Sequence, residues 1–262
     1  MNLRLSTASL ALLLSVSALG AEPEPAAMTA TELAGRLSAK QQDGTALIRV
    51  RMENSGGGTL QLQIKSRASR GSTDLVYQVL YPKERKGEAV LLRRSGGRFT
   101  GTLFTPPDTL RSLTPGQLDE PLFGSGLSYE DVIDNFFAWD QQAIVGSETV
   151  DRVNCTILES KPGKGTRSAY ASVRAWVDIR RLVPLRIEKY SAPGRVLRRI
   201  DTTRVVTDDK GRPLPANLTI RGPGGIVTEL DGSRIKHGVT ISDTDFTPEG
   251  LRDLTAPHGA AE

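Results

Sequence analysis

The stretch Leu60-Gln61-Leu62-Gln63-Ile64-Lys65 alternates strictly between apolar and polar side chains. Successive side chains of a β-strand point to opposite faces, so this pattern predicts a strand with three apolar residues on one face. Strands of this kind typically form an antiparallel sheet that has one face covered by the core and one face exposed to water. Residues 54–58 (NSGGG), just before the stretch, predict a hairpin turn.

The same alternation continues on both sides of this stretch. It predicts further strands at residues 46–52, 75–81, 89–93, 99–104, 153–159, 171–178, 185–191, 197–207, 216–222, 226–230 and 234–241. Turns rich in glycine and proline, such as residues 162–165 (PGKG), separate these strands. Residues 106–123 contain four prolines and no regular pattern. A connection of that length is usually functional or mobile.

Two segments show the spacing of helices instead. In residues 29–40, Thr29 and Glu32 form a capping-box pattern, and apolar residues follow at helical spacing. In residues 128–137, Ser128 caps the predicted helix and Asp131 reaches back to it. The apolar face of this second helix consists of Tyr129, Val132, Ile133, Phe136 and Phe137. The sequence thus predicts a mainly β fold, in which short helices cover the concave face of a single curved antiparallel sheet.

The N-terminus has the pattern of a secretory signal peptide. Arg4 supplies a positive charge, residues 10–16 (LALLLSV) are apolar, and Ala18 and Gly20 are the small residues of a cleavage site. The apolar run is shorter than the roughly 20 residues that span a bilayer. Ala21 stands where a lipoprotein would carry its acylated cysteine. We therefore expect a soluble periplasmic protein without a lipid anchor, formed by cleavage of residues 1–20, with 21–28 as spacer, 29–255 as one domain and 256–262 as a disordered tail.

Composition argues against nucleic acid as a partner. The sequence pI is about 9.3, but the formal net charge is only +4 and the basic residues are mixed with acidic ones. This charge fits weak attraction to anionic membranes. The sequence lacks the aromatic platforms that are typical of nucleic-acid binding. The single cysteine, Cys155, alternates with Val153 and Ile157, which predicts a small core residue rather than a disulfide.

The sequence offers no arrangement of residues for catalysis or metal binding. Residues 124–126 (GSG) lack the strand-to-helix context of a nucleophile elbow. His237 and His258, the two histidines, are expected at the solvated surface, and Asp208-Asp209 before Gly211 is typical of a turn. A lone cysteine and scattered histidines do not form a zinc site. We therefore expect no enzyme, no metal and no cofactor.

Helices across a curved sheet leave an apolar hollow between the two layers, which leads to two hypotheses. Either a lipid chain lies in the hollow, or the helices fill it and nothing binds there. Physical reasoning alone leaves these alternatives open.

Residues 123–131 (FGSGLSYED) resemble the G-S-D-[FL]-S-Y-E-D motif of the outer-membrane lipoprotein-sorting protein family, which is similar to the periplasmic lipoprotein carrier LolA. Further matches follow in the order of that family, over residues 29–254. They are the strand at 153–159, the W-V-D and P-L-K strands at 175–178 (AWVD) and 183–188 (VPLRIE), the next strand at 197–200 (LRRI), the W-[VI]-P turn at 213–215 (PLP) and the closing F-[ST]-P-x-x-L at 246–251 (FTPEGL). The sequence departs from the family at Gly126, where the motif has aspartate, and in residues 81–91 and 106–121.

The resemblance implies an incomplete β-barrel like LolA and LolB, closed by a helical lid. It implies a monomeric carrier that binds acyl chains of lipoproteins or lipids for transfer toward the outer membrane, between an inner-membrane transporter and an outer-membrane acceptor. Ser125 and Gly126 are the expected hinge of the lid. The expected lipid-binding residues are Leu60, Leu62, Ile64, Val132, Ile133, Phe136 and Phe137.

Two other hypotheses compete with the carrier. In the first, the chain is a non-catalytic accessory subunit of a lipid-exporting membrane transporter, which it contacts through residues 106–123. In the second and weaker one, it is a structural protein of the cell envelope.

Overall fold

The computed structural model describes residues 28–41, 44–69 and 71–255, and these contain thirteen strands in one antiparallel sheet. The expected signal peptide, the spacer except for Met28, and the expected tail lie outside the described residues. The strands are β1 (Gly44–Asn54), β2 (Gly58–Ser69), β3 (Ser72–Tyr81), β4 (Ala89–Ser95), β5 (Arg98–Thr105), β6 (Thr109–Leu113), β7 (Gln141–Val150), β8 (Val153–Lys161), β9 (Ser172–Asp178), β10 (Val183–Tyr190), β11 (Val196–Thr207), β12 (Pro213–Arg221) and β13 (Val227–His237).

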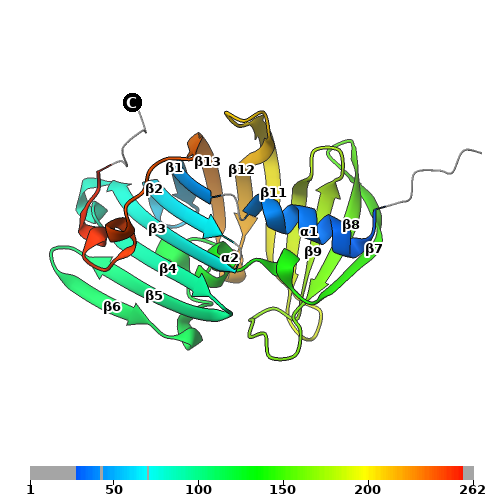
Figure 1. Ribbon diagram of the computed structural model, residues 1–262, viewed down its shortest axis with the longest axis horizontal. Coiled ribbons are helices and arrows are strands. Elements are labelled where there is room, and N and C mark those ends of the chain that lie inside the picture. The colour runs from blue at the N-terminus through cyan, green and yellow to red at the C-terminus, as the bar shows by residue number, and fades with distance from the viewer. Residues whose placement is uncertain (1–27, 42–43, 70, 256–262) are drawn as a thin grey trace, which may run out of the picture.

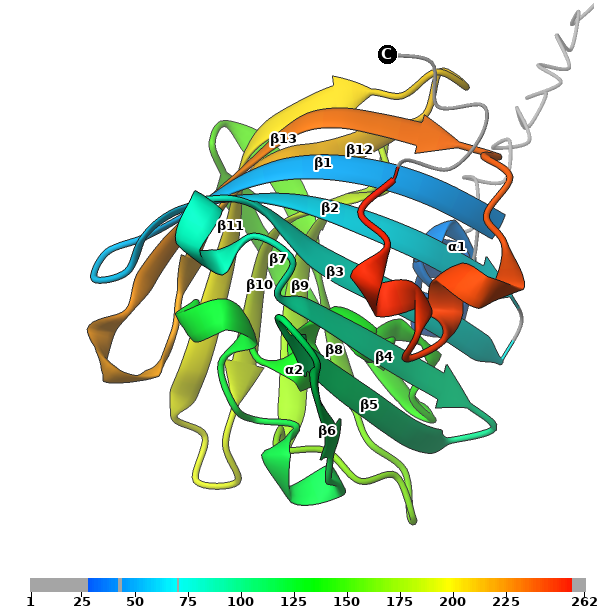
Figure 2. The ribbon, with the colours of Figure 1, turned by 90° about the vertical axis from the view of Figure 1, so that its left-hand side faces the viewer.

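The order of strands across the sheet is β6-β5-β4-β3-β2-β1-β13-β12-β11-β10-β9-β8-β7. Strands that follow each other in the chain pair with each other, except that β6 and β7 lie at opposite edges of the sheet, and β13 returns to pair with β1. The sheet curves strongly on itself, while β6 and β7 remain at its two edges (Figures 1 and 2). This architecture confirms the predicted mainly β fold with one curved antiparallel sheet.

The register of the first strands explains how the concave face acquires its apolar surface. Met52 pairs with Leu60, Val50 with Leu62, and Ile48 with Ile64. Because directly opposite residues of antiparallel strands point to the same face, the alternation of the two strands adds up to one apolar surface. The predicted stretch at Leu60–Lys65 lies in the middle of β2.

Two α-helices cover this concave face. Helix α1 (Ala30–Gln41) packs Leu33, Ala34 and Leu37 against the inner side of β8 and β9. Its start has the predicted cap, because Thr29 Oγ1 accepts from the backbone N–H of Glu32 at 3.2 Å. Helix α2 (Tyr129–Ile133) lies inside the curve of the sheet (Figure 2). Short 3-10 helices complete the structure: η1 (Lys83–Arg85), η2 (Pro115–Gln117), η3 (Leu122–Gly124), η4 (Phe136–Ala138), η5 (Pro223–Gly225), η6 (Asp243–Phe246) and η7 (Gly250–Arg252).

The predicted helix at 128–137 is wrong in its length. Helix α2 ends at Ile133, Asp134 takes an extended conformation with ψ 141°, and the separate helix η4 begins at Phe136. Tertiary contacts outweigh the helical pattern here. Asp134 forms an ion pair with Arg94 of β4, and Asn135 donates to Ser38 of α1 at 2.9 Å.

Three strand assignments also differ from the prediction. Strand β6 lies within the segment 106–123, and β7 was not predicted at all. Both are edge strands whose side chains are mostly exposed, so selection for alternating apolar residues is weak there. The two strands predicted at 226–230 and 234–241 form the single strand β13, which a register shift opposite Arg49 and Val50 interrupts.

The convex face is not wholly exposed, contrary to the prediction of one wet face. The C-terminal segment with η6 and η7 packs Phe246 and Leu251 against the outer side of β3, β4 and β5 (Figure 2). Beneath this segment Gln63 and Lys65 are fully buried, and Lys65 Nζ lies 2.5 Å from Asp245 Oδ1. The polar side chains of β2 on the convex face are therefore part of a second, polar core.

The prediction that Cys155 is a small core residue is confirmed, whereas His237, expected at the solvated surface, is largely buried, with 15% of its side chain exposed. Cys155 is fully buried on the outer side of the sheet and packs in one cluster with Val153, Ile157 and Trp176. None of the helices in the described segments has the length and apolar character needed to cross a membrane.

Candidate functional site

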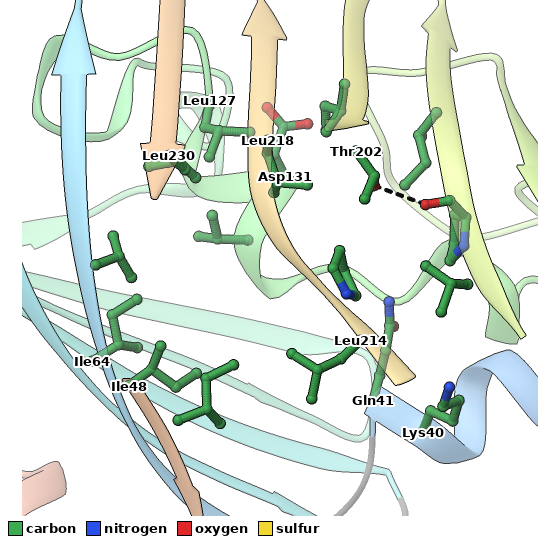
Figure 3. A pocket seen from close by; sticks show the side chains of 18 of the residues that line it. Lys40, Gln41, Ile48, Ile64, Leu127, Asp131, Thr202, Leu214, Leu218 and Leu230 are labelled. Carbon is green, nitrogen blue, oxygen red and sulfur yellow. Dashed lines mark hydrogen bonds between the residues drawn. The ribbon is translucent and has the colours of Figure 1, made fainter. Parts of the chain in front are cut away.

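A cavity of about 470 Å³ lies between the concave face of the sheet and the segments that cross it. Strands β1 to β3 and β10 to β13 line it from the sheet, and the end of α1 and residues around α2 line it from the other side. Most lining side chains are apolar. They include Ile48, Ile64, Leu214, Leu218 and Leu230 (Figure 3).

The cavity runs along the paired strands β1 and β13 and is closed at one end. Met52 pairs with Leu230 at this end, and Met52, Leu62 and Leu122 are almost completely shielded from solvent. No charged side chain of the described lining lies beside these residues except Asp131, which is neutralised as described below. The closed end therefore offers an apolar surface without free hydrogen-bonding groups.

The opposite end of the cavity is polar and open to solvent. It lies where β1 begins to pair with the end of β13, and Lys40 and Gln41 at the end of α1 are exposed there (Figure 3). Lys40 Nζ donates to the carbonyl oxygens of Arg181 (3.3 Å), Leu182 (3.1 Å) and Pro213 (2.9 Å). These bonds fix the end of α1 to two turns of the sheet. We call the polar end, formed by Lys40, Gln41, Asp208, Arg212 and His237, the rim.

The Asp208 side chain organises the β11–β12 hairpin at the rim. It accepts from the backbone N–H groups of Lys210 (2.9 Å) and Arg212 (2.7 Å), and the Arg212 guanidinium forms an ion pair with it at 2.8 Å. Burial opposes the charge of Asp208, but these hydrogen bonds outweigh it and lower the pKa of the carboxyl. The prediction that Asp208 stabilises a turn is confirmed. Side-chain atoms of His237 and Asp209 that could bind a metal ion lie within 4.8 Å of an Asp208 oxygen. The Asp208 oxygens, however, are already bound by Arg212 and by backbone N–H groups.

Residues 114–140 cross the hollow of the sheet and form the roof of the cavity. This segment connects the edge strand β6 with the opposite edge strand β7, so it must span the whole width of the concave side. The predicted capping box is confirmed. Ser128 Oγ accepts from the Asp131 N–H at 3.2 Å, while Asp131 Oδ2 accepts from the Ser128 N–H at 2.7 Å.

Asp131 also anchors the roof to the sheet through two buried ion pairs. Its Oδ1 lies 2.7 Å from Lys189 Nζ of β10, and its Oδ2 lies 2.9 Å from Arg198 Nε of β11. The Tyr170 hydroxyl donates to Oδ1 at 2.7 Å. The exposed fractions of the Asp131, Lys189 and Arg198 side chains are 0%, 3% and 5%. Burial would raise the pKa of Asp131, but the two cations outweigh burial and lower it.

Two further acidic residues of the roof bind neighbouring elements. Glu130 accepts from the Ala169 N–H at 3.1 Å and from the Ser168 hydroxyl, which attaches the loop before β9. Asp134 pairs with Arg94 of β4. Burial raises the pKa of both carboxyl groups despite these partners. The roof is thus attached to both halves of the sheet.

The expected hinge, Ser125 and Gly126, is buried in the structure. Gly126 donates to Thr228 Oγ1 at 2.9 Å and its carbonyl accepts from Arg198 Nε at 2.8 Å. A Cβ atom on Gly222 would lie 2.6 Å from the Cα atom of Gly126, so the two backbones touch. This close approach gives a physical reason for a glycine where the family motif has aspartate. A hinge at this point remains a prediction, and it would require these contacts to break.

The structure places four of the seven expected lipid-binding residues on the cavity surface. These are Leu62, Ile64, Val132 and Phe137. Leu60 and Ile133 lie in the adjacent core under α2, and Phe136 packs beside Phe137 and Trp139. Contact of any of these residues with lipid stays a prediction.

Sequence reasoning missed the half of the cavity that β10 to β13 contribute, and it missed the rim. The alternation of Leu214 and Leu218 in β12, and of Leu230 in β13, was a usable signal for the wall. The rim had no such signal, because Lys40, Arg212 and His237 are brought together only by the pairing of β13 with β1.

Solved structures show which class of protein has this fold. The chain is similar to a DUF1329 family protein from Desulfovibrio piger, with 22% identity and a TM-score of 0.78 over 85% of this chain and 97% of that chain. It is also similar to a putative outer membrane lipoprotein-sorting protein domain from Vibrio parahaemolyticus, with 19% identity and a TM-score of 0.77 over 86% of this chain and 98% of that chain. A LolA superfamily protein from Nitrosomonas europaea matches with 20% identity and a TM-score of 0.66 over 86% of this chain and 100% of that chain. The chain therefore has the LolA-like fold.

A protein-family model with the description "Uncharacterized protein" matches residues 71–253, which is more than half of the chain. The chain belongs to this family. No curated protein matches the sequence.

Proposed function

We propose that the protein is a non-enzymatic carrier that binds an acyl chain in the cavity beneath α2. The observation that carries this proposal is the form of the cavity, which is apolar and closed at one end and polar and open at the other. A hydrophobic tail would occupy the closed end, and the polar part of the lipid would remain at the rim. The LolA-like fold supports the same class of function.

The apolar surface supplies enough free energy for useful affinity. Burying one methylene group contributes about 0.8 kcal/mol, so about ten buried methylenes contribute roughly 8 kcal/mol before the costs of association. A Kd near 1 µM corresponds to about 8 kcal/mol. Because the costs of association subtract from this sum, about ten methylenes give a Kd weaker than 1 µM, which suits a carrier that must release its cargo.

We place this activity in the periplasm, with residues 1–20 as a cleaved signal peptide and residues 29–255 as the carrier domain. The cargo would be a lipid or the acyl chains of a lipoprotein on the way toward the outer membrane, received from an inner-membrane transporter and delivered to an acceptor. Opening would require the segment around α2 to move, with Ser125 and Gly126 as the hinge.

A cavity-filling variant tests the carrier hypothesis. Val50 lines the cavity in the middle of β1, and Val50→Trp should fill much of the space for an acyl chain. We expect the affinity for a fluorescent fatty-acid probe to fall about tenfold or more, because several methylenes lose their place. Val196→Trp is the matched control, since Val196 lies at the start of β11 with 44% of its surface exposed. Equal binding by both folded variants would contradict the proposal.

One observation favours the accessory-subunit hypothesis as a second candidate. Strand β6 forms a sheet edge within residues 106–123, its side chains are mostly exposed, and Leu110 is 40% exposed. Such an edge can accept a strand from a partner protein. A folded wild-type protein that binds no lipid probe would move the balance to this hypothesis.

A further inference from the structure

The rim differs from the rest of the cavity in charge as well as polarity. Lys40 and Arg212 are its cations and Asp208 is its acid, and the Asp209 carboxylate lies within 4.8 Å of the Asp208 carboxylate. Asp208 is occupied by its ion pair with Arg212 and by backbone N–H groups. Lys40, in contrast, donates to three uncharged carbonyl oxygens, and within residues 28–41, 44–69 and 71–255 no carboxylate forms an ion pair with it. Lys40 is thus a rim cation that forms no ion pair with the described residues.

Two further features indicate that the rim can accommodate an anion. Burial and the charge of Arg212 lower the pKa of Lys40, although Asp208 opposes them, so the surroundings disfavour a second cation. Both ring nitrogens of His237 are buried without a hydrogen-bond partner in the described structure, and Nε2 lies 3.4 Å from Asp208 Oδ2. A buried polar group without a partner is costly, and a ligand oxygen at the rim would supply one.

The size of the cavity limits the cargo. Pockets for a single small ligand have volumes of about 300–1,000 Å³, and this cavity, at about 470 Å³, lies in the lower part of that range. Its closed end is lined by fully buried side chains such as Met52 and Leu62. One acyl chain suits this space better than two or three chains.

We propose, on the basis of the carrier function above, that the cargo is a single-chain lipid with an anionic headgroup. Its tail lies along β1 beneath α2, and its carboxylate or phosphate oxygens lie at the rim beside Lys40, Arg212 and His237. Lys40 attracts the headgroup while its hydrogen bonds hold α1 in place.

Binding of three lipids with the same chain length tests this proposal and separates the two sources of negative charge. The probes are palmitate, palmitoyl-lysophosphatidylglycerol and monopalmitoylglycerol, which carry a carboxylate, a phosphate and no charge. We expect at least one anionic lipid to bind about threefold to fivefold more tightly than the neutral lipid, the effect of one partly exposed charge pair. Dipalmitoyl-phosphatidylglycerol should bind at least about tenfold more weakly than its single-chain counterpart, because its second chain has no place to lie.

Substitutions at Lys40 identify the source of the preference. Lys40→Gln removes the charge and keeps a donor for the carbonyl oxygens, so it should weaken binding of the anionic lipid more than binding of monopalmitoylglycerol and thereby abolish the preference. Lys40→Arg should retain the preference. Lys164→Gln, in an exposed turn far along the chain, is the matched control for loss of one charge.

The possible failures are distinguishable. Equal affinity for the charged and neutral lipids, or an equal loss for all three in Lys40→Gln, would overturn the anionic headgroup and leave the carrier function standing. Tighter binding of the two-chain lipid would overturn the single-chain cargo. If the folded wild-type protein binds none of the lipids, the carrier function fails and this inference fails with it.

Discussion

Asp131→Asn should destabilise the protein more than any surface charge change, because it breaks both ion pairs between the roof of the cavity and the sheet. Asparagine is nearly isosteric, but it presents only one acceptor oxygen where Asp131 serves Lys189 and Tyr170 on one side and Arg198 and Ser128 on the other. On either orientation of the amide, its NH₂ group faces donors. Two cations would remain buried without their counter-charge.

The expected loss is about 3–5 kcal/mol of unfolding free energy, the usual effect of removing one partner from a buried ion pair. Urea denaturation followed by tryptophan fluorescence measures it, because Trp139 is buried beside Phe136 in the same segment. The slope of unfolding free energy against urea concentration should stay unchanged, which identifies a change in stability alone.

Glu53→Gln is the matched control for this substitution. Glu53 pairs with Arg51 at 2.8 Å, but the two side chains are 52% and 55% exposed. The control should cost less than about 1 kcal/mol. A double-mutant cycle with Lys189→Met should give a coupling energy of at least about 2 kcal/mol. If Asp131→Asn stays within about 1 kcal/mol of the wild type, the ion pairs do not anchor the roof and our reasoning is wrong.

The remaining predictions concern acid and backbone packing. A lowered pKa means that Asp131 stabilises the fold fully above its unfolded value of about 3.9 and loses this effect as pH falls through its folded value. The stability gap between wild type and Asp131→Asn should therefore shrink below about pH 4, and a gap of constant size would contradict the lowered pKa. Gly222→Ala should cost about 1–3 kcal/mol in urea denaturation, because its Cβ would lie 2.6 Å from Gly126 Cα. Gly35→Ala, with nothing within 4 Å in helix α1, should be neutral or stabilising by about 0.5–1 kcal/mol, and similar losses in both variants would refute a specific contact at Gly222.

The parts of the fold that were predictable are those in which one residue's neighbours in sequence decide its environment. Alternation at Leu60, Leu62 and Ile64 revealed a strand and its buried face because side-chain direction has a period of two in any strand. The Ser128–Asp131 capping box was equally local. Edge strand β7 escaped detection because most of its side chains are exposed on both faces, so its sequence carries no alternation.

Long-range burial was beyond these local rules. Lys65 has the sequence pattern of a solvated residue, yet the C-terminal segment covers it and Asp245 neutralises it. The helical pattern over 128–137 was equally misleading, because ion pairing of Asp134 with Arg94 competes with the helix. In both cases the deciding partner lies far away in sequence, and an unaligned sequence gives no information on such pairs.

The motif at 123–131 and the rim have different tasks in this interpretation. Ser128, Glu130 and Asp131 use their hydrogen-bonding groups on the backbone, on Ser168 and Ala169, and on buried cations. Little polar capacity is left for a ligand, so the motif determines the position of the roof and the width of the cavity. The rim residues Lys40 and His237 retain a charge or hydrogen-bonding atoms that the described protein does not match. Relatives with the same motif would then share the cavity and differ in cargo according to the side chains at the rim.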